Sequence, residues 1–165
     1  MTAANPRDHT VEVVVRVESP DQPDVRALLT KLDEYQSSLY PPESNHLLGL
    51  EALMAPDVRF FVARREGMAF GCGALKVERD GTAEVKRMYV EPASRGRGIG
   101  KALMREIEAE ARRASVKWLR LETGIHQPEA IGLYMSGGFR EIPAFPPYKP
   151  DPLSRFFEKQ VPLSG

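Results

Sequence analysis

The sequence predicts an α+β fold: a mixed, mostly antiparallel sheet of about six to seven strands, flanked by helices. Three observations support this prediction. Strand and helix periodicities follow one another in the order β-α-α-β-β-β-α-β-α-β-β along residues 11–161. Short turns join the consecutive strands in the middle of that order, which makes those strands antiparallel. The length of 165 residues matches one ordinary domain, so we expect a flexible N-terminus at 1–10 and a single domain at 11–165.

In the first half, the elements follow from valine-rich alternation, helical spacing and turn residues. Apolar residues from Val25 to Tyr35 lie at helical spacing, and Pro41 and Pro42 end that helix. Asp80-Gly81 is a strong hairpin signal, because both central residues of the favoured turn take positive φ. The predicted elements are strands at 11–17, 58–65, 68–77 and 82–90, a helix between 21 and 40, a short helix at 43–53 and a turn at 66–67.

In the second half, an amphipathic helix is predicted at 99–115, because Ile99, Leu103 and Ile107 begin an apolar stripe along one helical face. Pro128 suits the first turn of a later helix, which a Gly-Gly pair at 137–138 would cap. The remaining predicted elements are that helix at 128–136 and strands at 118–123, 139–141 and 155–161.

Composition and charge argue against several classes of protein. Lys+Arg and Asp+Glu both number 23, so the formal net charge is zero, which argues against a protein that coats nucleic acid. The single cysteine, Cys72, can form neither an internal disulfide nor a cysteine-rich zinc site, and we expect it to be buried in a strand. No apolar run is long enough for a membrane span, and the polar start lacks the core of a signal peptide. We therefore expect a cytoplasmic protein without a metal, a nucleic-acid partner or a membrane partner.

The most informative motif is a glycine-rich segment between a strand and a helix. Three glycines alternate within Arg95–Lys101, directly after a turn at Pro92. Free N–H groups at the start of the following helix form a phosphate cradle, and the cationic side chains of the same segment add positive charge beside it. The alternative is a flexible turn with solvated arginines. The segment has neither the Gly-Lys-Ser/Thr ending of a Walker loop nor the spacing of a dinucleotide fingerprint.

Two motifs resemble those of the GNAT superfamily, the acyl-CoA-dependent N-acetyltransferases. Residues 95–100, Arg-Gly-Arg-Gly-Ile-Gly, resemble that family's Arg/Gln-x-x-Gly-x-Gly/Ala motif. Residues 133–139, Leu-Tyr-Met-Ser-Gly-Gly-Phe, resemble its later Leu-Tyr-x-x-x-Gly-Phe segment. The predicted order of elements matches the family over residues 11–161. The resemblance implies a bacterial-type, single-domain N-acetyltransferase with acetyl-CoA as acyl donor, and a homodimer is a common assembly in that family.

The resemblance also implies where coenzyme A binds. Backbone amides of the glycine-rich segment would hold its pyrophosphate. The pantetheine arm would pair with the main chain of the fourth strand, which in this family carries a bulge and splays from the fifth. Gln127 stands where many members carry an asparagine, and Arg87 and Arg105 are expected to extend the cationic mouth around the loop. The implied cofactor-binding residues are Met88, Tyr89, Val90, Arg95, Gly96, Arg97, Gly98, Ile99, Gly100, Lys101, Gln127 and Tyr134.

Two catalytic residues are implied by the same resemblance. Tyr134 matches the tyrosine that hydrogen-bonds or protonates the departing CoA thiolate; the alternative is a helix tyrosine with its ring in the core and a wet hydroxyl. Glu84 lies six residues before Val90, the spacing of the general base in the histone-acetylating branch. Its alternative is a solvated strand residue paired with Lys86. Glu122 is the second candidate for the base.

The acceptor side of the site is implied less directly. Strict alternation places Arg87 on the opposite face of its strand from Glu84, and a guanidinium in the pocket would suit a carboxylate on the acceptor. The expected reaction is direct attack by a small-molecule primary amine on acetyl-CoA in a ternary complex. The alternatives are a protein acceptor, at a lysine or an N-terminal amine, and a non-catalytic CoA-binding or sensing module. The implied substrate residues are Tyr40, Arg87, Glu122 and Tyr148.

Overall fold

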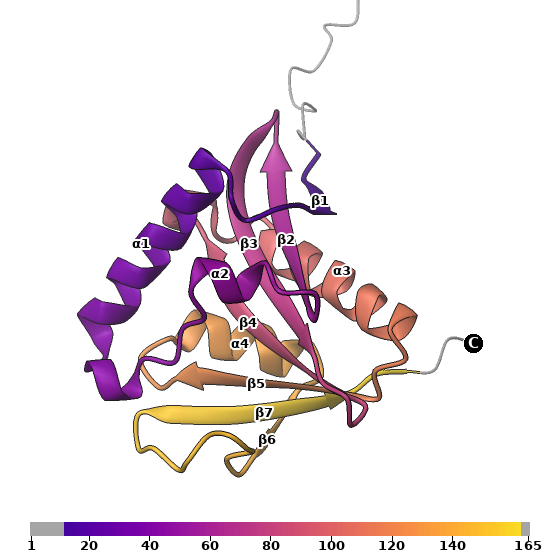
Figure 1. Ribbon diagram of the computed structural model, residues 1–165. Coiled ribbons are helices and arrows are strands. Elements are labelled where there is room, and N and C mark those ends of the chain that lie inside the picture. The colour runs from indigo at the N-terminus through magenta and orange to yellow at the C-terminus, as the bar shows by residue number, and fades with distance from the viewer. Residues whose placement is uncertain (1–11, 163–165) are drawn as a thin grey trace, which may run out of the picture.

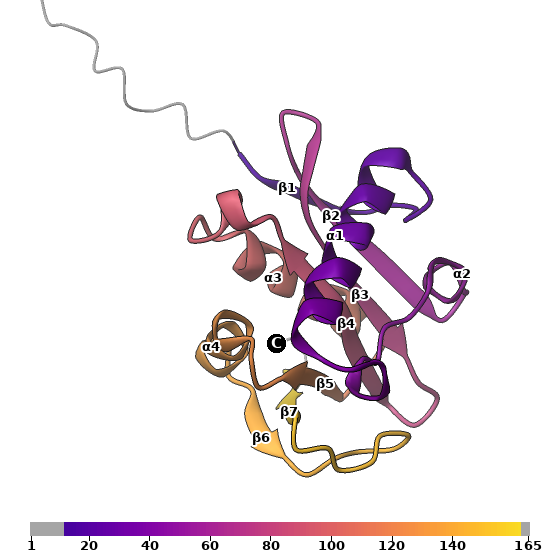
Figure 2. The same ribbon diagram turned by 90° about the vertical axis from the view of Figure 1, so that its left-hand side faces the viewer.

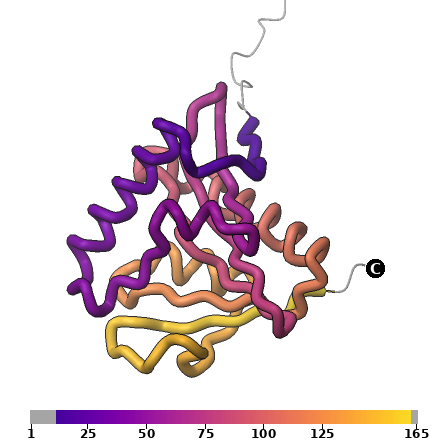
Figure 3. The backbone as a smooth tube through the Cα atoms, viewed as in Figure 1, coloured from indigo at the N-terminus to yellow at the C-terminus, as the bar shows by residue number. Residues whose placement is uncertain are grey.

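Seven strands form one continuous sheet in the computed structural model, which describes residues 12–162 (Figure 1). The order is β1-β2-β3-β4-β5-β7-β6; β4 and β5 run parallel, and all other neighbours are antiparallel. Figure 3 follows the chain to β7, which lies between β5 and β6. The strands are β1 (Val14–Val17), β2 (Val58–Arg65), β3 (Met68–Val77), β4 (Thr82–Val90), β5 (Trp118–Gly124), β6 (Arg140–Ile142) and β7 (Ser154–Gln160). The helices are α1 (Pro23–Leu39), α2 (Leu50–Leu53), α3 (Ile99–Arg113) and α4 (Pro128–Ser136), with short 3₁₀ turns η1 (Pro42–Ser44) and η2 (Pro92–Ser94).

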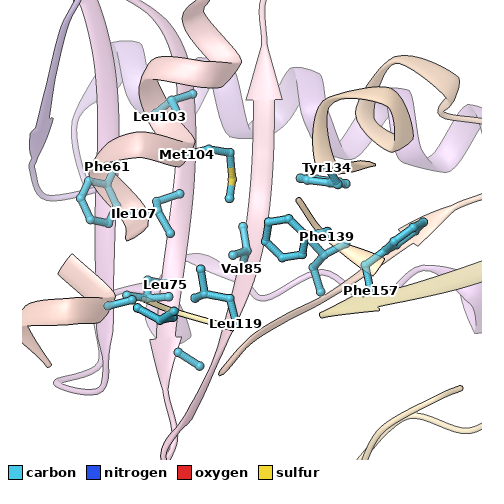
Figure 4. Close-up of a cluster of buried hydrophobic side chains, with 14 of the residues drawn as sticks. Phe61, Leu75, Val85, Leu103, Met104, Ile107, Leu119, Tyr134, Phe139 and Phe157 are labelled. Carbon is cyan, nitrogen blue, oxygen red and sulfur yellow. The ribbon is translucent and has the colours of Figure 1, made fainter. Parts of the chain in front are cut away.

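Helices cover both faces of the sheet, and each face has its own apolar core (Figure 2). On one face, α1 and α2 bury Leu28, Leu32 and Leu53 against β2 and β3. On the other, α3 and α4 bury a larger cluster that includes Ile107 and Tyr134 (Figure 4). The apolar stripe predicted for the helix at 99–115 is the buried side of α3. Removal of this area from water stabilises the fold by roughly 25 cal/mol per Å².

The predicted fold class and order of elements are confirmed. β2, β3, β4 and α4 have the predicted bounds, and the other strands and long helices differ by a few residues at their ends. The first strand begins at Val14 rather than at residue 11. Residues 1–11 lie outside the described part of the chain, and with them the N-terminus predicted to be flexible.

The helix predicted at 43–53 is wrong. Only η1 and the four-residue α2 are helical there, and residues 45–49 between them are irregular. Long-range contacts hold this segment: Ser44 Oγ donates a hydrogen bond to Asp151 Oδ2 (2.7 Å), and His46 packs edge-on against Tyr148 with ring centroids 5.3 Å apart. These contacts override a helical pattern that is weak and only local.

Positive φ occurs at a different hairpin turn from the one predicted. Glu66 and Gly67, between β2 and β3, take φ values of 51° and 77°, the signs that a two-residue primed turn requires. At the β3–β4 hairpin only Gly81 takes positive φ (87°). Asp80 instead accepts hydrogen bonds from the backbone N–H (3.0 Å) and the hydroxyl (2.6 Å) of Thr82. The hairpin prediction is confirmed, but the conformation predicted for Asp80 is wrong.

A β-bulge near the end of β4 changes which face its last residues present. Two residues of β4, Arg87 and Met88, oppose the single residue Gly73 of β3. Arg87 takes φ 58°, a left-handed conformation that is uncommon for a residue with a Cβ. Its side chain therefore reaches α1, where it contacts Asp33, on the same side of the sheet as Glu84. The prediction from strict alternation is wrong for Arg87, because the bulge inserts one residue into the count.

β4 and β5 pair only at their starts. Thr82–Glu84 pairs with Trp118–Arg120, and beyond these residues the two strands diverge (Figure 1). Their carboxyl ends face α1 on one side and α4 on the other. Among residues 12–162, no helix is both long enough and apolar enough to cross a membrane.

Candidate active site

A cavity of about 620 Å³ opens where β4 diverges from β5. Its wall combines the end of β4, the glycine-rich segment, the first turn of α3, and residues of α4 and α1. Every residue predicted to bind the cofactor lines this cavity, with the exception of Arg97. Met88 and Val90 also pack against the apolar core, as expected for strand residues that offer only main chain to a ligand.

The glycine-rich segment forms an open cradle at the start of α3. Gly96 and Gly98 take φ values of 78° and 79°, and no atom lies within 4 Å of the point where a Cβ would stand on either. The left-handed conformation, rather than crowding, therefore requires glycine at both positions. At Gly100 the reason is packing, since a Cβ would lie 3.0 Å from Leu133 of α4. The free N–H groups of the first turn of α3 face this cradle, a geometry that binds anions.

Arg95 spans the larger cavity. Its Nε donates to the backbone oxygen of Val90 (3.1 Å) and its Nη1 to Glu129 on α4 (3.0 Å). The guanidinium lies 5.7 Å from the ring centroid of Tyr35 on α1. Arg95 and Lys101 are thus the cations in this wall. Arg87 was expected to share this mouth but lines a second cavity instead.

The second cavity is smaller, about 60 Å³, and adjoins the first. Leu32, Met88, Gln127, Ala130 and Tyr134 line both, so the two cavities meet at Tyr134. The η1 turn and the irregular segment after it form part of the smaller cavity's wall. All four predicted substrate residues and Glu84 line it: Tyr40, Glu84, Arg87, Glu122 and Tyr148.

Glu84 is buried, with 8 % of its surface exposed, and belongs to a cluster of three side chains. Lys86 Nζ donates to Glu84 Oε1 (3.1 Å) and to the Tyr148 hydroxyl (2.7 Å), and that hydroxyl donates to Glu84. Burial, followed by the charge of Glu84, raises the pKa of Tyr148 above its ordinary range. The alternative interpretation of Glu84 was therefore correct about its partner, Lys86, but not about exposure to solvent.

Glu122 is the carboxylate of the smaller cavity that has no ion-pair partner among the described residues. Its Oε1 accepts a hydrogen bond from Ser154 Oγ (2.9 Å). Burial raises the pKa of Glu122 above that of an ordinary glutamate and outweighs the hydrogen bond from Ser154 and the nearby His46 and Lys86, which lower it. Burial also raises the pKa of Tyr134, and the charge of Glu122 contributes to that shift. Glu122 and Tyr134 both line the smaller cavity, and Tyr134 lines the larger one as well.

Arg87 is almost fully buried, its side chain 3 % exposed, while its partner Asp33 is 52 % exposed. Nη1 of Arg87 donates to Asp33 Oδ1 (2.6 Å). The backbone oxygen of Arg87 accepts a hydrogen bond from the thiol of Cys72 (3.4 Å). Cys72 is fully buried, as predicted, and burial raises the pKa of its thiol to about 12.

Tyr40 closes the smaller cavity on the side of α4. Its hydroxyl accepts a hydrogen bond from the backbone N–H of His126 (3.0 Å) and donates one to Gln127 Oε1 (3.3 Å). A Cβ on Gly124 would lie 1.8 Å from that hydroxyl, so glycine is needed there for the tyrosine to approach. The ring of Tyr40 stacks on that of His126, with centroids 5.7 Å apart.

Several residues of the two walls were not predicted as site residues. Ser94, buried in η2, lines the larger cavity, as does Glu129 of α4. Asn45 lines the smaller one, and Asp33 anchors Arg87 from α1. Ser94 and Glu129 lie close in the chain to predicted site residues. Asn45 and Asp33 carry no local motif and reach the site through long-range packing. Among residues 12–162, no three His, Cys, Asp or Glu side chains are grouped closely enough to hold a metal ion.

Comparison with known proteins gives a consistent family signal. Residues 56–141 match the family model described as an acetyltransferase (GNAT) domain. A protein named IAA acetyltransferase, from Azospirillum brasilense, is 51% identical over 150 residues, which cover 90% of this chain and 98% of that protein. An uncharacterised N-acetyltransferase from Bacillus subtilis, YsnE, is 34% identical over 82% of this chain and 93% of its own length.

Solved structures agree with these sequence matches. A Klebsiella pneumoniae protein described as an acyl-CoA N-acyltransferase is 36% identical, with a TM-score of 0.78, over 92% of this chain and 99% of that one. The PaiA N-acetyltransferase of Thermoplasma acidophilum, solved in complex with coenzyme A, has a TM-score of 0.70 over 90% of this chain and 99% of its own. At 18% identity, this second likeness concerns the fold alone.

Proposed function

This chain belongs to the GNAT family of acetyltransferases, and on that premise we propose that it transfers an acetyl group from acetyl-CoA to the primary amine of a small molecule. The observation that carries the proposal is the pair of cavities that meet at Tyr134. One of them, of about 620 Å³, includes an anion cradle for a phosphorylated donor. The other is small, polar and lined by carboxylates. Donor and acceptor would therefore lie in the enzyme together, as direct transfer requires.

The residues of the larger cavity suit a coenzyme A group. The open space around Gly96 and Gly98 leaves room for phosphate oxygens close to the backbone. When bound, the group would supply an acetyl thioester at its far end. The main chain at 88–90, unpaired on the side of β5, would hold the arm that carries it. Arg95 would then exchange its contact with the oxygen of Val90 for one with the ligand.

Removal of a proton from the acceptor's ammonium falls to Glu122 in this proposal. A general base works best when its pKa approaches the working pH, and burial shifts the pKa of Glu122 in that direction. Glu84, which the sequence placed first as the general base, is the alternative candidate for this role. Its carboxylate is already engaged by Lys86 and by the Tyr148 hydroxyl, so it is less free than Glu122 to contact an acceptor.

Tyr134 would stabilise the leaving thiolate. Its pKa is raised above that of an ordinary phenol, so the hydroxyl stays protonated and is a weak acid toward a thiolate. This favours donation of a hydrogen bond to the developing charge over complete proton transfer. Tyr134 lines both cavities, as that role requires.

The size of the smaller cavity, about 60 Å³, favours a small acceptor over a protein. The segment at 45–47 lines it next to Ser44 of η1, which is hydrogen-bonded to Asp151, and Tyr148 lines it as well. A polypeptide would need that segment to move. The relative named IAA acetyltransferase makes IAA one acceptor to include in a test.

Two measurements test the proposal. Acetyl-CoA and CoA should raise the melting temperature; the absence of a shift with either would contradict the donor assignment. Acetyl-CoA with a panel of small amines and IAA should then release free thiol. The buried Cys72 is the chain's single cysteine, so a thiol reagent reports CoA rather than the protein. A melting shift without thiol release from any acceptor would favour the binding module, and release with a lysine peptide alone would favour a protein acceptor.

A further inference from the structure

We propose that the acceptor amine also carries a carboxylate, and that the guanidinium of Arg87 binds this carboxylate in the smaller cavity. The inference rests on the proposed function, since it names the class of acceptor for the same site. Its evidence is independent of the donor side: the hydrogen-bonding state of Arg87, the charges of the cavity wall, and the position of Glu122.

The free edge of Arg87 has the geometry that a carboxylate needs. Nη1 is engaged by Asp33, which leaves the opposite edge, formed by Nε and Nη2. Nε is buried and has no hydrogen-bond partner among the described residues. Nε and Nη2 together present two parallel N–H groups, the fork that matches the two oxygens of a carboxylate. A buried N–H without an acceptor is costly, so a ligand that supplies one gains free energy at this position.

The position of Arg87 is built into the fold. The bulge at the end of β4 turns this side chain toward α1, at the price of a left-handed φ of 58°. Without that bulge the guanidinium would lie on the apolar face beneath α3. The bulge therefore adds a second cation, besides Lys86, to the wall that holds Glu84 and Glu122.

Charge balance favours one carboxylate over a phosphate. Lys86 is neutralised by Glu84 and Arg87 by Asp33, which is half exposed to water. Glu122 has no such partner among the described residues. A molecule with one ammonium and one carboxylate compensates Glu122 with its amine and shares Arg87 with Asp33, whereas a dianion would add excess negative charge.

The cavity offers a complementary group to each end of such an acceptor: a carboxylate for its amine and a guanidinium for its carboxylate. Glu122 and Tyr134 both line the smaller cavity, and Tyr134 also lines the larger one, so the amine would be acetylated on this side. Asn45 Oδ1 in the same wall is buried and has no hydrogen-bond partner among the described residues, so it offers a second oxygen to an ammonium. Arg87 then receives the other end of the molecule. An amino acid is the simplest compound with this pattern.

The test gives the full-length protein matched sets of acceptors. Each set holds an α-amino acid, its carboxamide and its decarboxylated amine, and the sets differ in the amino acid's side chain. Thiol release from acetyl-CoA gives kcat/KM for each. We expect the acid to exceed both analogues by at least about tenfold in one or more sets, through a lower KM. Equal use of the acid, the amide and the amine would overturn the inference while leaving the proposed function standing. No release from any amine would overturn both.

Variants of the chain test the role of Arg87 itself. Arg87→Gln should reduce the ratio of kcat/KM between acid and amine toward one, and Arg87→Lys should restore part of it. Arg79→Gln, in the exposed turn between β3 and β4, is the matched control and should keep the wild-type ratio. If Arg87→Gln fails to fold, Asp33→Asn still decides: it frees the guanidinium from its competitor and should increase the preference for the acid. A preference that survives Arg87→Gln, or that falls in Asp33→Asn, would contradict the assignment.

Discussion

At the residue scale, the proposed mechanism uses two side chains whose pKa values burial raises in the same direction but with opposite uses. The raised pKa of Glu122 would make its carboxylate a better base, and the raised pKa of Tyr134 keeps its phenol protonated as a hydrogen-bond donor. In each case burial favours the uncharged form of the group. Both side chains line the smaller cavity.

Replacement of Tyr134 by Phe removes the donor and keeps the ring in the core. We expect kcat to fall by about 10²-fold, with little change in the affinity for CoA, because the hydroxyl acts on charge that develops in the transition state. Steady-state kinetics and a CoA titration on the same protein measure both quantities. Wild-type turnover in Tyr134→Phe would remove this residue from the mechanism.

Glu122→Gln and Glu84→Gln distinguish the two candidate bases. We expect Glu122→Gln to lower kcat/KM by about 10²-fold or more. Glu84→Gln should keep more activity and lower the melting temperature, since it leaves Lys86 buried without its carboxylate. A pH profile of kcat/KM gives a second test. The fall in kcat/KM at low pH should have an apparent pKa above that of an ordinary glutamate, because it reflects protonation of Glu122. If Glu84→Gln abolishes activity and Glu122→Gln does not, the roles are reversed.

The pKa of Glu122 also predicts a pH dependence of stability. Since the folded-state pKa is raised above that of the unfolded chain, ionisation of Glu122 opposes folding. Glu122→Gln should therefore melt at a higher temperature than wild type at neutral pH, and the gap should close as the pH falls below the pKa of an ordinary glutamate. Glu34→Gln, exposed on α1, removes the same charge at the surface and is the matched control. A lower melting temperature for Glu122→Gln at neutral pH would contradict the assigned burial cost.

At the element scale, the site is positioned by close approaches that glycines permit. Gly124, the last residue of β5, admits the Tyr40 hydroxyl from the end of α1, and this contact joins two elements that the sheet does not connect. Gly100 similarly admits Leu133, which brings the cradle at the start of α3 onto α4. The first approach lies in the wall of the smaller cavity and the second in the wall of the larger one.

Two alanine substitutions test the importance of this packing. Gly124→Ala should destabilise the fold by about 1–3 kcal/mol, because the new methyl group would overlap Tyr40. Gly132→Ala, within α4, meets no atom within 4 Å and should stabilise by about 0.5–1 kcal/mol through helix propensity. Urea denaturation of both variants measures the difference. If Gly124→Ala is as stable as Gly132→Ala, the contact with Tyr40 does not contribute to the fold.

Much of this element arrangement could be predicted from local patterns. The periodicity of β2, β3, β4 and α3, and the capping glycines after α4, are properties of neighbouring residues, and those predictions are confirmed. The irregular segment at 45–49 and the face of Arg87 were not predictable in this way. The first depends on Asp151 and Tyr148, far along the chain, and the second on a one-residue bulge that no sequence period records.

At the scale of the whole molecule, a net charge of zero conceals an uneven distribution. The larger cavity has Arg95 and Lys101 in its wall beside the helix start, while the smaller one holds both signs in near balance. The sequence predicted a group of cations around the glycine-rich segment and counted Arg87 among them. In the structure Arg87 lines the smaller cavity instead, and Asp33 neutralises its charge. The two cavities are therefore electrostatically different, and Tyr134 is one of the residues that line both.

A crystal structure of the protein with CoA is the sharpest test of the proposed donor site. We expect the pyrophosphate on the backbone amides of 96–101, the arm along the main chain of β4 at 88–90, and the sulfur beside the Tyr134 hydroxyl, which lines both cavities. CoA bound outside the opening between β4 and β5, or with its sulfur away from Tyr134, would rule out this binding mode.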